Sequence, residues 1–249
     1  MSGHSKWSTI KRKKGAEDAK RGKVFTKLAK DITLAAREGG GDETSNAKLK
    51  LAIGKAKSAN MPKDNIDRAI KRGTGEIDGG QLEELIYEGY GPDGIAFIVE
   101  IVTDNKNRSL AEVKHAFNKN GGNLANSGAV AWQFEQKGYI VLEEGKYDFE
   151  EVFMIAAEAG ADDVADEEGL VAIYTPREAF GAVIQALQDN HYEIAESELR
   201  WEAQNTTELS IEQSLKNMRL MDWLDNLDDV QNVSCNLLIT DEIAEAFGE

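Results

Sequence analysis

The sequence has few of the features that support a secreted, membrane-bound or zinc-binding protein. Its 249 residues include one cysteine, Cys235, so neither an intramolecular disulfide nor a cluster of thiolate zinc ligands can form. No stretch approaches the roughly 18 uncharged apolar residues of a membrane span, and the N-terminal segment carries charges where a signal peptide needs an apolar core. We therefore expect a cytoplasmic protein without a membrane partner.

A constellation typical of catalysis or of cofactor binding is also missing. The three histidines lie far apart in the sequence, and no Ser-His-Asp set can be assembled around them. The glycine-rich segments lack the spacing of phosphate-binding loops and are typical of helix caps and hinges. Acidic runs that could hold Mg²⁺ fall at predicted loops and helix ends, where solvated carboxylates are ordinary. The sequence therefore predicts a protein that is not an enzyme and that binds neither a cofactor nor a metal.

Basic residues are scarce in most of the chain and concentrated near its start. The formal net charge is −16, which alone would argue against binding to a polyanion. Up to Gly75, however, 19 Lys and Arg face 8 Asp and Glu, whereas 10 basic and 37 acidic residues follow. A reversal from +11 to −27 within one chain indicates that the first part faces a polyanion while the rest stays soluble or faces a basic partner.

The basic part is predicted to form a flexible arm, residues 1–22, and a three-helix bundle, residues 23–78. In the first helix, which we expect to begin at Lys23, one side is apolar and Leu34 lies outside it. That side comprises Phe25, Leu28, Ile32, Ala35 and Ala36, and the opposite side carries Lys23, Lys27, Lys30 and Arg37. Asn46 is a candidate N-cap for a second helix, and a third begins near Pro62 and ends at Gly73.

The acidic part alternates between predicted strands and helices. A strand at 95–102, a helix at 108–119 and a strand at 129–134 open it, and a helix at 211–227 with a strand at 231–239 closes it. The segment between them forms a complete β-α-β-β-α-β unit. The prediction is an α+β multidomain chain in which the three-helix bundle precedes two ferredoxin-like α/β domains, one inserted in the other. The split domain takes 79–135 plus 205–249, and the inserted domain takes 136–204.

The candidate binding residues are cations that can neutralise phosphates, together with an indole that can stack on an unpaired base. A basic run is often only a solvated surface, but the acidic remainder of the chain favours a functional interpretation here. The candidates are His4, Lys6, Trp7, Lys11, Arg12, Lys13, Lys14, Lys20, Arg21, Lys23, Lys27, Lys30, Lys57, Lys63, Arg68, Lys71 and Arg72.

Five segments, taken in order, resemble the YebC/PmpR family, whose mitochondrial members are called translational activators of cytochrome oxidase. They are GHSKW with the following IK and KK (3–14), ANMPKDNIDRAIKRGTG (59–75), YEGYGPDG (87–94), TDNKNR (103–108) and GAVAWQF (128–134). The resemblance implies a helical N-terminal domain, two α/β domains with one inserted in the other, and a cytoplasmic regulator that is not an enzyme.

The resemblance leaves open whether the protein binds DNA or RNA. Bacterial members are generally described as DNA-binding transcriptional regulators, whereas others are described as ribosome-associated factors that ease translation of difficult sequences such as proline runs. No predicted helix has the base-reading pattern of a recognition helix, so duplex DNA and ribosomal RNA both remain candidate partners. A third alternative is an interaction adaptor whose acidic domains bind the ribosome or a basic protein.

Overall fold

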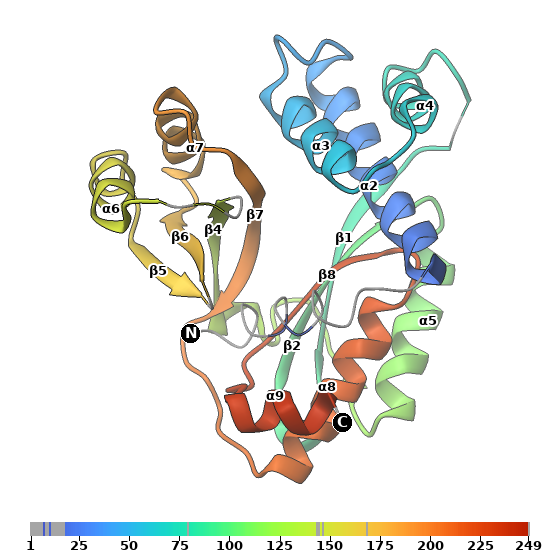
Figure 1. The fold of residues 1–249 in the computed structure, drawn as a ribbon. Helices are drawn as coiled ribbons and strands as arrows, with labels where there is room; N and C mark the ends of the chain where they lie inside the picture. The colour runs from blue at the N-terminus through green and yellow to red at the C-terminus, as the bar shows by residue number, and fades with distance from the viewer. Residues whose placement is uncertain are drawn as a thin grey trace. The chain divides into compact units, whose positions relative to one another are not determined.

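The computed structural model describes residues 7, 10, 18–78, 80–142, 145, 147–167 and 169–248. The chain forms two compact units, the first from residues 1–134 with 202–249 and the second from residues 135–201. As predicted, helices come first and α/β domains follow, and the structure has two four-stranded sheets (Figure 1). We call residues 18–78 the helical domain, the remainder of the first unit the split domain, and residues 135–201 the inserted domain. Within the described ranges, no helix is both long enough and apolar enough to span a membrane.

Three helices make up the helical domain: α2 (Asp18–Gly39), α3 (Ala47–Ser58) and α4 (Lys63–Gly73). The first begins at Asp18 rather than at Lys23, so it takes in residues that the sequence assigned to the arm. The predicted apolar sides meet in one core, because residues three and four positions apart share a helix face. This core contains Ile32, Ala35, Ala36, Leu49, Ala52, Ile53, Ala56, Met61, Ile66 and Ala69.

Asn46 fixes the turn between α2 and α3, as the sequence predicts. Its side-chain oxygen accepts a hydrogen bond from the Leu49 backbone N–H at 3.0 Å, which satisfies one of the free donors at the start of α3. Its amide nitrogen donates to the carbonyls of Ala35 and Gly40, both at 2.8 Å. One buried amide therefore caps α3 and ties it to the end of α2.

Gly73 lies where α2 and α4 pack closely. A Cβ at this position would collide with the Thr33 carbonyl and lie 2.7 Å from the Ala36 Cβ. We expect Gly73→Ala to lower the free energy of unfolding by about 1–3 kcal/mol, because the helices must move apart. Gly54→Ala is the matched control, since nothing lies within 4 Å of a Cβ there and the change in a helix interior should stabilise by up to about 1 kcal/mol. Urea denaturation of the full chain compares the two, and equal effects would contradict the prediction.

The split domain has one sheet with helices packed on it. The strands are β1 (Glu83–Tyr90), β2 (Ala96–Thr103), β3 (Asn123–Leu124) and β8 (Val230–Cys235), in the order β3-β1-β2-β8. The helices are α5 (Lys106–Lys119), α8 (Ile211–Asp225) and α9 (Asp241–Gly248). Short 3₁₀ turns occupy Pro92–Gly94 and Ala131–Gln133. Figure 1 shows α5 and α8 side by side against the sheet.

The core of the split domain forms around β2, the β-branched strand that the sequence predicts. Phe97, Val99 and Ile101 alternate along it and are at most 1% exposed. Phe97 packs edge-to-face on Phe117 of α5, with 5.9 Å between the ring centroids. On the other face, Ala96, Ile98 and Val102 are at most 5% exposed, so the strand is covered on both faces and its sequence is almost continuously apolar.

Two predicted features of the split domain differ from the structure. The expected strand at 129–134 is wrong, because Ala131–Gln133 form a 3₁₀ turn and the strand begins only at Phe134. The sequence prediction also lacks β1, which pairs antiparallel with β2 from Glu83 opposite Thr103 to Tyr90 opposite Ala96. Acidic residues and a glycine interrupt the apolar pattern of β1, so its strand character is weak in sequence.

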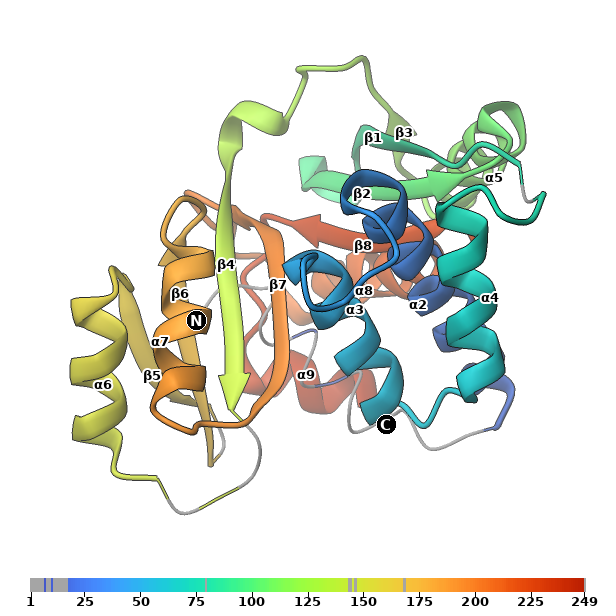
Figure 2. The ribbon, with the colours of Figure 1, turned by 90° about the horizontal axis from the view of Figure 1, so that it is seen from above.

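The inserted domain follows the predicted β-α-β-β-α-β order. It consists of β4 (Phe134–Leu142), α6 (Phe149–Glu158), β5 (Asp163–Glu167), β6 (Leu170–Pro176), α7 (Phe180–Asp189) and β7 (Ile194–Ala203). The strand order is β5-β6-β4-β7, which is ferredoxin-like. Helix α6 contacts β5 and α7, and α7 contacts β6 (Figure 2).

Candidate nucleic-acid interface

One side of α2 contacts the split domain through lysines. Lys23 Nζ donates to the Asn226 carbonyl at 2.6 Å, and Lys27 Nζ lies 3.1 Å from both the carbonyl and a carboxylate oxygen of Asp225. These acceptors lie at the C-terminal end of α8, where unpaired carbonyls carry partial negative charge. The two lysines of the helical domain therefore cap the C-terminal end of α8 in the split domain.

The same side of α2 continues with an apolar contact. Leu34 packs with Leu82 and Val102 in a small buried cluster. One turn further on, Arg37 donates to the Leu82 carbonyl at 2.5 Å. The residue that did not fit the apolar side of α2 thus belongs to a second contact side, which joins the helical domain to the split domain.

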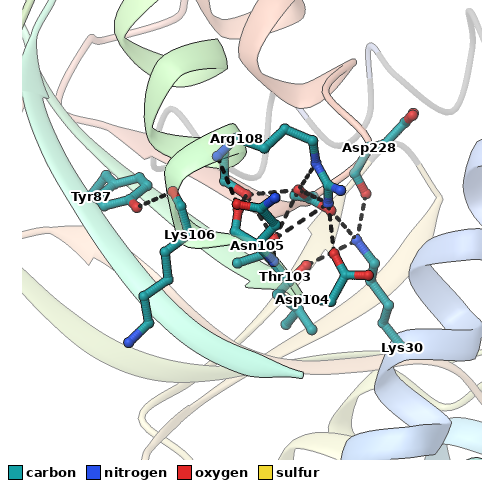
Figure 3. Close-up of polar contacts among 11 residues, drawn as sticks. Lys30, Tyr87, Thr103, Asp104, Asn105, Lys106, Arg108 and Asp228 are labelled. Atoms are coloured by element: carbon teal, nitrogen blue, oxygen red, sulfur yellow. Dashed lines mark hydrogen bonds and ion pairs between the residues drawn. The ribbon is translucent and has the colours of Figure 1, made fainter. Parts of the chain in front are cut away.

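Asp229 is the centre of this joint. Its carboxylate is 5% exposed and accepts hydrogen bonds from Lys30 Nζ at 2.7 Å, Arg108 Nη2 at 2.7 Å and Ser109 Oγ at 2.7 Å. Figure 3 labels two of these donors, Lys30 and Arg108. Thr103 Oγ1 donates to it at 3.0 Å. Burial by itself would raise the pKa of Asp229, but the hydrogen bonds from Lys30, Arg108 and Ser109 outweigh it and hold that pKa well below its usual range.

The turn at residues 103–108 positions the donors of this cluster. The Asn105 side chain caps α5 by accepting from the Arg108 backbone N–H at 3.1 Å. The Arg108 guanidinium also pairs with Asp104 at 3.0 Å (Figure 3). Lys106 pairs with Glu83 at 2.5 Å. The TDNKNR segment therefore forms a helix start that directs one arginine onto Asp229.

The structure places three of the candidate lysines of α2 against the split domain. Lys23, Lys27 and Lys30 were predicted to contact nucleic acid, but all three donate to groups of the split domain, and the side chains of Lys27 and Lys30 are 18% and 14% exposed. A phosphate contact by Lys30 would break a buried ion pair. The physical reason is that split-domain carbonyls and carboxylates lie against this face of the helix.

The sequence predicts that Trp7 lies on a free arm and stacks on a base, but the structure places it elsewhere. It is 4% exposed, belongs to the core of the split domain and packs against Phe247 with 5.6 Å between ring centroids. Its indole is therefore covered by the protein. Lys20 and Arg21 lie in the first turn of α2. The other arm candidates lie outside the described residues: His4, Lys6, Lys11, Arg12, Lys13 and Lys14.

A cavity of about 440 Å³ lies beside the Asp229 cluster, between α2, α4 and the split domain. Arg68 and Arg72, one turn apart on α4, line it. Neither guanidinium has an ion pair or hydrogen bond with any residue in the described part of the chain. The remaining lining residues are Phe25, Thr26, Ala29, Lys30, Thr33, Asn65, Ala69, Leu82, Asp104, Arg108, Asp228 and Asp229.

Exposed cations continue over α3 and α4. Residues 47–73 contain eight Lys and Arg but only two Asp. We call six of these cations, all exposed, the basic set: Lys50, Lys57, Lys63, Arg68, Lys71 and Arg72. Within the described ranges, no ion pair joins any of them to a carboxylate. Five of the six, all except Lys50, are predicted site residues, and within the described ranges they remain open to an external anion.

A buried carboxylate that the sequence prediction did not single out holds the loop before β4. Glu88 is 4% exposed and accepts from the backbone N–H groups of Gly128 at 2.6 Å, Val130 at 2.7 Å and Ala131 at 2.9 Å. Burial would raise the pKa of Glu88, but these three donors lower it below its ordinary value. The clamped loop presents Trp132, whose side chain is 72% exposed. The available signal was a glutamate that follows the apolar residues Leu85 to Tyr87 of β1.

Cys235 lies in the core on β8 and has a structural role. Burial raises the pKa of its thiol to about 12, so the reactive thiolate is not populated near neutral pH. In the described part of the chain, no group of three or more His, Cys, Asp or Glu side chains is arranged to hold a metal ion.

Family models match the chain on both sides of the division between basic and acidic parts. The model for the TACO1/YebC protein N-terminal domain matches residues 5–76, and the model for the TACO1/YebC second and third domain matches residues 82–237. The chain belongs to the TACO1/YebC family.

Full-length relatives agree with this assignment. A protein of Syntrophus aciditrophicus is 51% identical over 98% of this chain and 98% of its own length, and one of Geobacter sulfurreducens is 52% identical over 98% and 99%. Both are named "Probable transcriptional regulatory protein". The crystal structure of a conserved hypothetical protein from Aquifex aeolicus is 44% identical, with a TM-score of 0.83 over 91% of this chain and 93% of that chain.

Three of the segments that carry the family resemblance have structural roles here. The segment at 103–108 surrounds Asp229, and the segments at 87–94 and 128–134 meet at Glu88. The segment at 59–75 is different, because it contains α4 and most of its cations are exposed and unpaired within the described ranges. In this member of the TACO1/YebC family, α4 is therefore the strongest candidate for contact with a ligand.

Proposed function

We propose that this member of the TACO1/YebC family is a DNA-binding transcriptional regulator. It binds the phosphates of the DNA backbone with the basic set and acts without catalysis. The observation that carries the proposal is the contrast between α2 and the other two helices. Lys27 and Lys30 of α2 are paired with buried carboxylates of the split domain, whereas the basic set has no carboxylate partner within the described ranges. Neutralising phosphates and releasing their counterions supplies most of the affinity of such a surface. The names of the curated relatives support the regulatory role.

The placement of the cations favours backbone contact over base reading. Arg68, Lys71 and Arg72 lie in the second half of α4, whereas a recognition helix reads base edges mainly with its N-terminal residues. Asp64 and Asp67 occupy the first half, where they would repel phosphates. We therefore expect modest sequence preference and a strong dependence on salt.

Charge reversal on α4 tests the proposal. We expect Lys71→Glu with Arg72→Glu to weaken binding of a fluorescent DNA duplex by at least about tenfold, and to reduce the slope of log K against log salt by about 2, because two phosphate contacts are lost. Fluorescence anisotropy over a salt series measures both quantities. Circular dichroism checks that the variant is folded.

The matched control is Lys114→Glu with Lys119→Glu on α5, which makes the same change in net charge on an exposed helix of the split domain. It should leave affinity within about twofold. Equal losses in both variants would show that only net charge matters and would overturn the interface. Tight binding to single-stranded RNA with none to duplex DNA would retain the surface but replace the DNA assignment.

A further inference from the structure

Helix α6 of the inserted domain exposes three large apolar residues in addition to its buried side. Val152 and Ala156 are fully buried on the side that packs into the domain. Outside that side, the exposed fractions are 39% for Phe149, 43% for Phe153 and 57% for Met154. Phe149 and Phe153 are four residues apart, so they share one line along the helix at the edge of the buried side, and Met154 lies about 100° further round the exposed surface. We call these three side chains the α6 stripe.

The α6 stripe lies on a helix that is held in place by an N-cap and by packing within its domain. The Asp148 side chain caps α6 by accepting from the backbone N–H groups of Glu150 at 3.0 Å and Glu151 at 3.3 Å. The helix contacts β5 and α7 in the completed ferredoxin-like unit, in which Figure 2 shows α6 as an outer element. Two phenylalanines and a methionine kept in water on such a helix are typical of a binding surface.

The negative charge around the α6 stripe favours a basic partner. Exposed Glu150, Glu151 and Glu158 flank the stripe on the same helix. Residues 135–201 contain 17 Asp and Glu against 4 Lys and Arg, a net charge of −13. This field repels nucleic acid and anionic membranes, and it also opposes a second copy of the same domain.

We propose that the α6 stripe is a docking site for a basic amphipathic segment of a partner protein. The apolar side of that segment covers Phe149, Phe153 and Met154, and its Lys or Arg side chains pair with the flanking glutamates. In such a contact the apolar anchors lie at the centre and the charges at the rim. The surface is independent of the basic set, so one chain presents a site for a polyanion and a separate site for a polycation.

A synthetic amphipathic helix of Lys and Leu, labelled with a fluorophore, is the probe, and a Glu and Leu peptide of the same pattern is its counterpart. We expect the full chain to bind the Lys-Leu peptide and not the Glu-Leu peptide. Phe153→Gln with Met154→Gln leaves the net charge unchanged and should weaken binding at least about tenfold. Glu150→Gln with Glu158→Gln should weaken it less and flatten its salt dependence. Anisotropy titrations give these affinities.

Leu110→Gln is the matched control, because Leu110 is also an exposed apolar residue, 39% exposed, but lies on α5. It should bind the Lys-Leu peptide as the unmodified chain does. Unchanged binding by the stripe variant would overturn the proposal, since the peptide would then be held by acidic charge alone. Equal binding of both peptides would also overturn it. Self-association in sedimentation that the stripe variant abolishes would replace the partner protein by a second copy of the chain.

Discussion

Replacing Asp229 with alanine is expected to lower the free energy of unfolding by about 3–5 kcal/mol, because it leaves Lys30 and Arg108 without their shared buried partner. The loss also removes the acceptor of Ser109 and Thr103. Urea denaturation of the full chain, followed by circular dichroism, measures the effect. Because the carboxylate ties α2 to the split domain, the helical domain should also become more sensitive to proteolysis.

Asp228→Ala provides the control for this prediction. Asp228 is the neighbouring residue, its side chain is exposed, and the bond that it contributes to Lys30 comes from its backbone carbonyl at 2.9 Å, which alanine retains. We expect a change within about 0.5 kcal/mol. If Asp228→Ala and Asp229→Ala proved equally destabilising, the buried cluster would not be the cause.

The pH dependence gives a second readout of Asp229. Its pKa in the folded chain is lowered from an ordinary value of 3.8, so the folded state favours the ionised carboxylate. A group of this kind stabilises fully above its unfolded pKa, and that contribution is lost as the pH falls toward the folded pKa. The stability difference between the unmodified chain and Asp229→Ala should therefore be largest near neutral pH and shrink below about pH 4. A difference that grows on acidification would contradict the assignment.

Replacing Glu88 with alanine is expected to cost about 2–4 kcal/mol, because three backbone N–H groups lose a charged acceptor and one of them, at Val130, is buried. The loop that displays Trp132 should open more often. Hydrogen exchange measured by mass spectrometry should show faster exchange in peptides that contain Gly128, Val130 and Ala131.

Glu84→Ala is the matched control on the same strand. Glu84 is exposed, and no ion pair or side-chain hydrogen bond joins it to another residue in the described ranges. We expect little change in either stability or exchange. Unchanged exchange of the 128–131 amides in Glu88→Ala would show that the loop is held by other contacts, such as the hydrogen bond that the Tyr90 hydroxyl donates to the Ala129 carbonyl at 3.1 Å.

Local patterns in the sequence predicted much of this fold. The cap at Asn46, the helix start after Pro62 and the apolar run of β2 depend on neighbours a few residues away, and the structure contains all three. Strand β1 was missed because Glu88 interrupts its apolar pattern. That charge is tolerated in the strand only because a loop about 40 positions later supplies three N–H donors.

In the candidate site, too, some features follow from local sequence and others depend on contacts between distant parts of the chain. By itself, the sequence determined the family, through segments that resemble it. It also determined the order of helices and α/β domains and the reversal of charge at Gly75, because these follow from short-range periodicity and composition. It could not distinguish Lys27 from Arg72, since both are cations on the polar side of an amphipathic helix. Only the tertiary structure decided that Lys27 meets Asp225, 198 positions away, while Arg72 lines an open cavity. A lysine is neutralised or available according to what the rest of the chain places against it, and that depends on long-range packing.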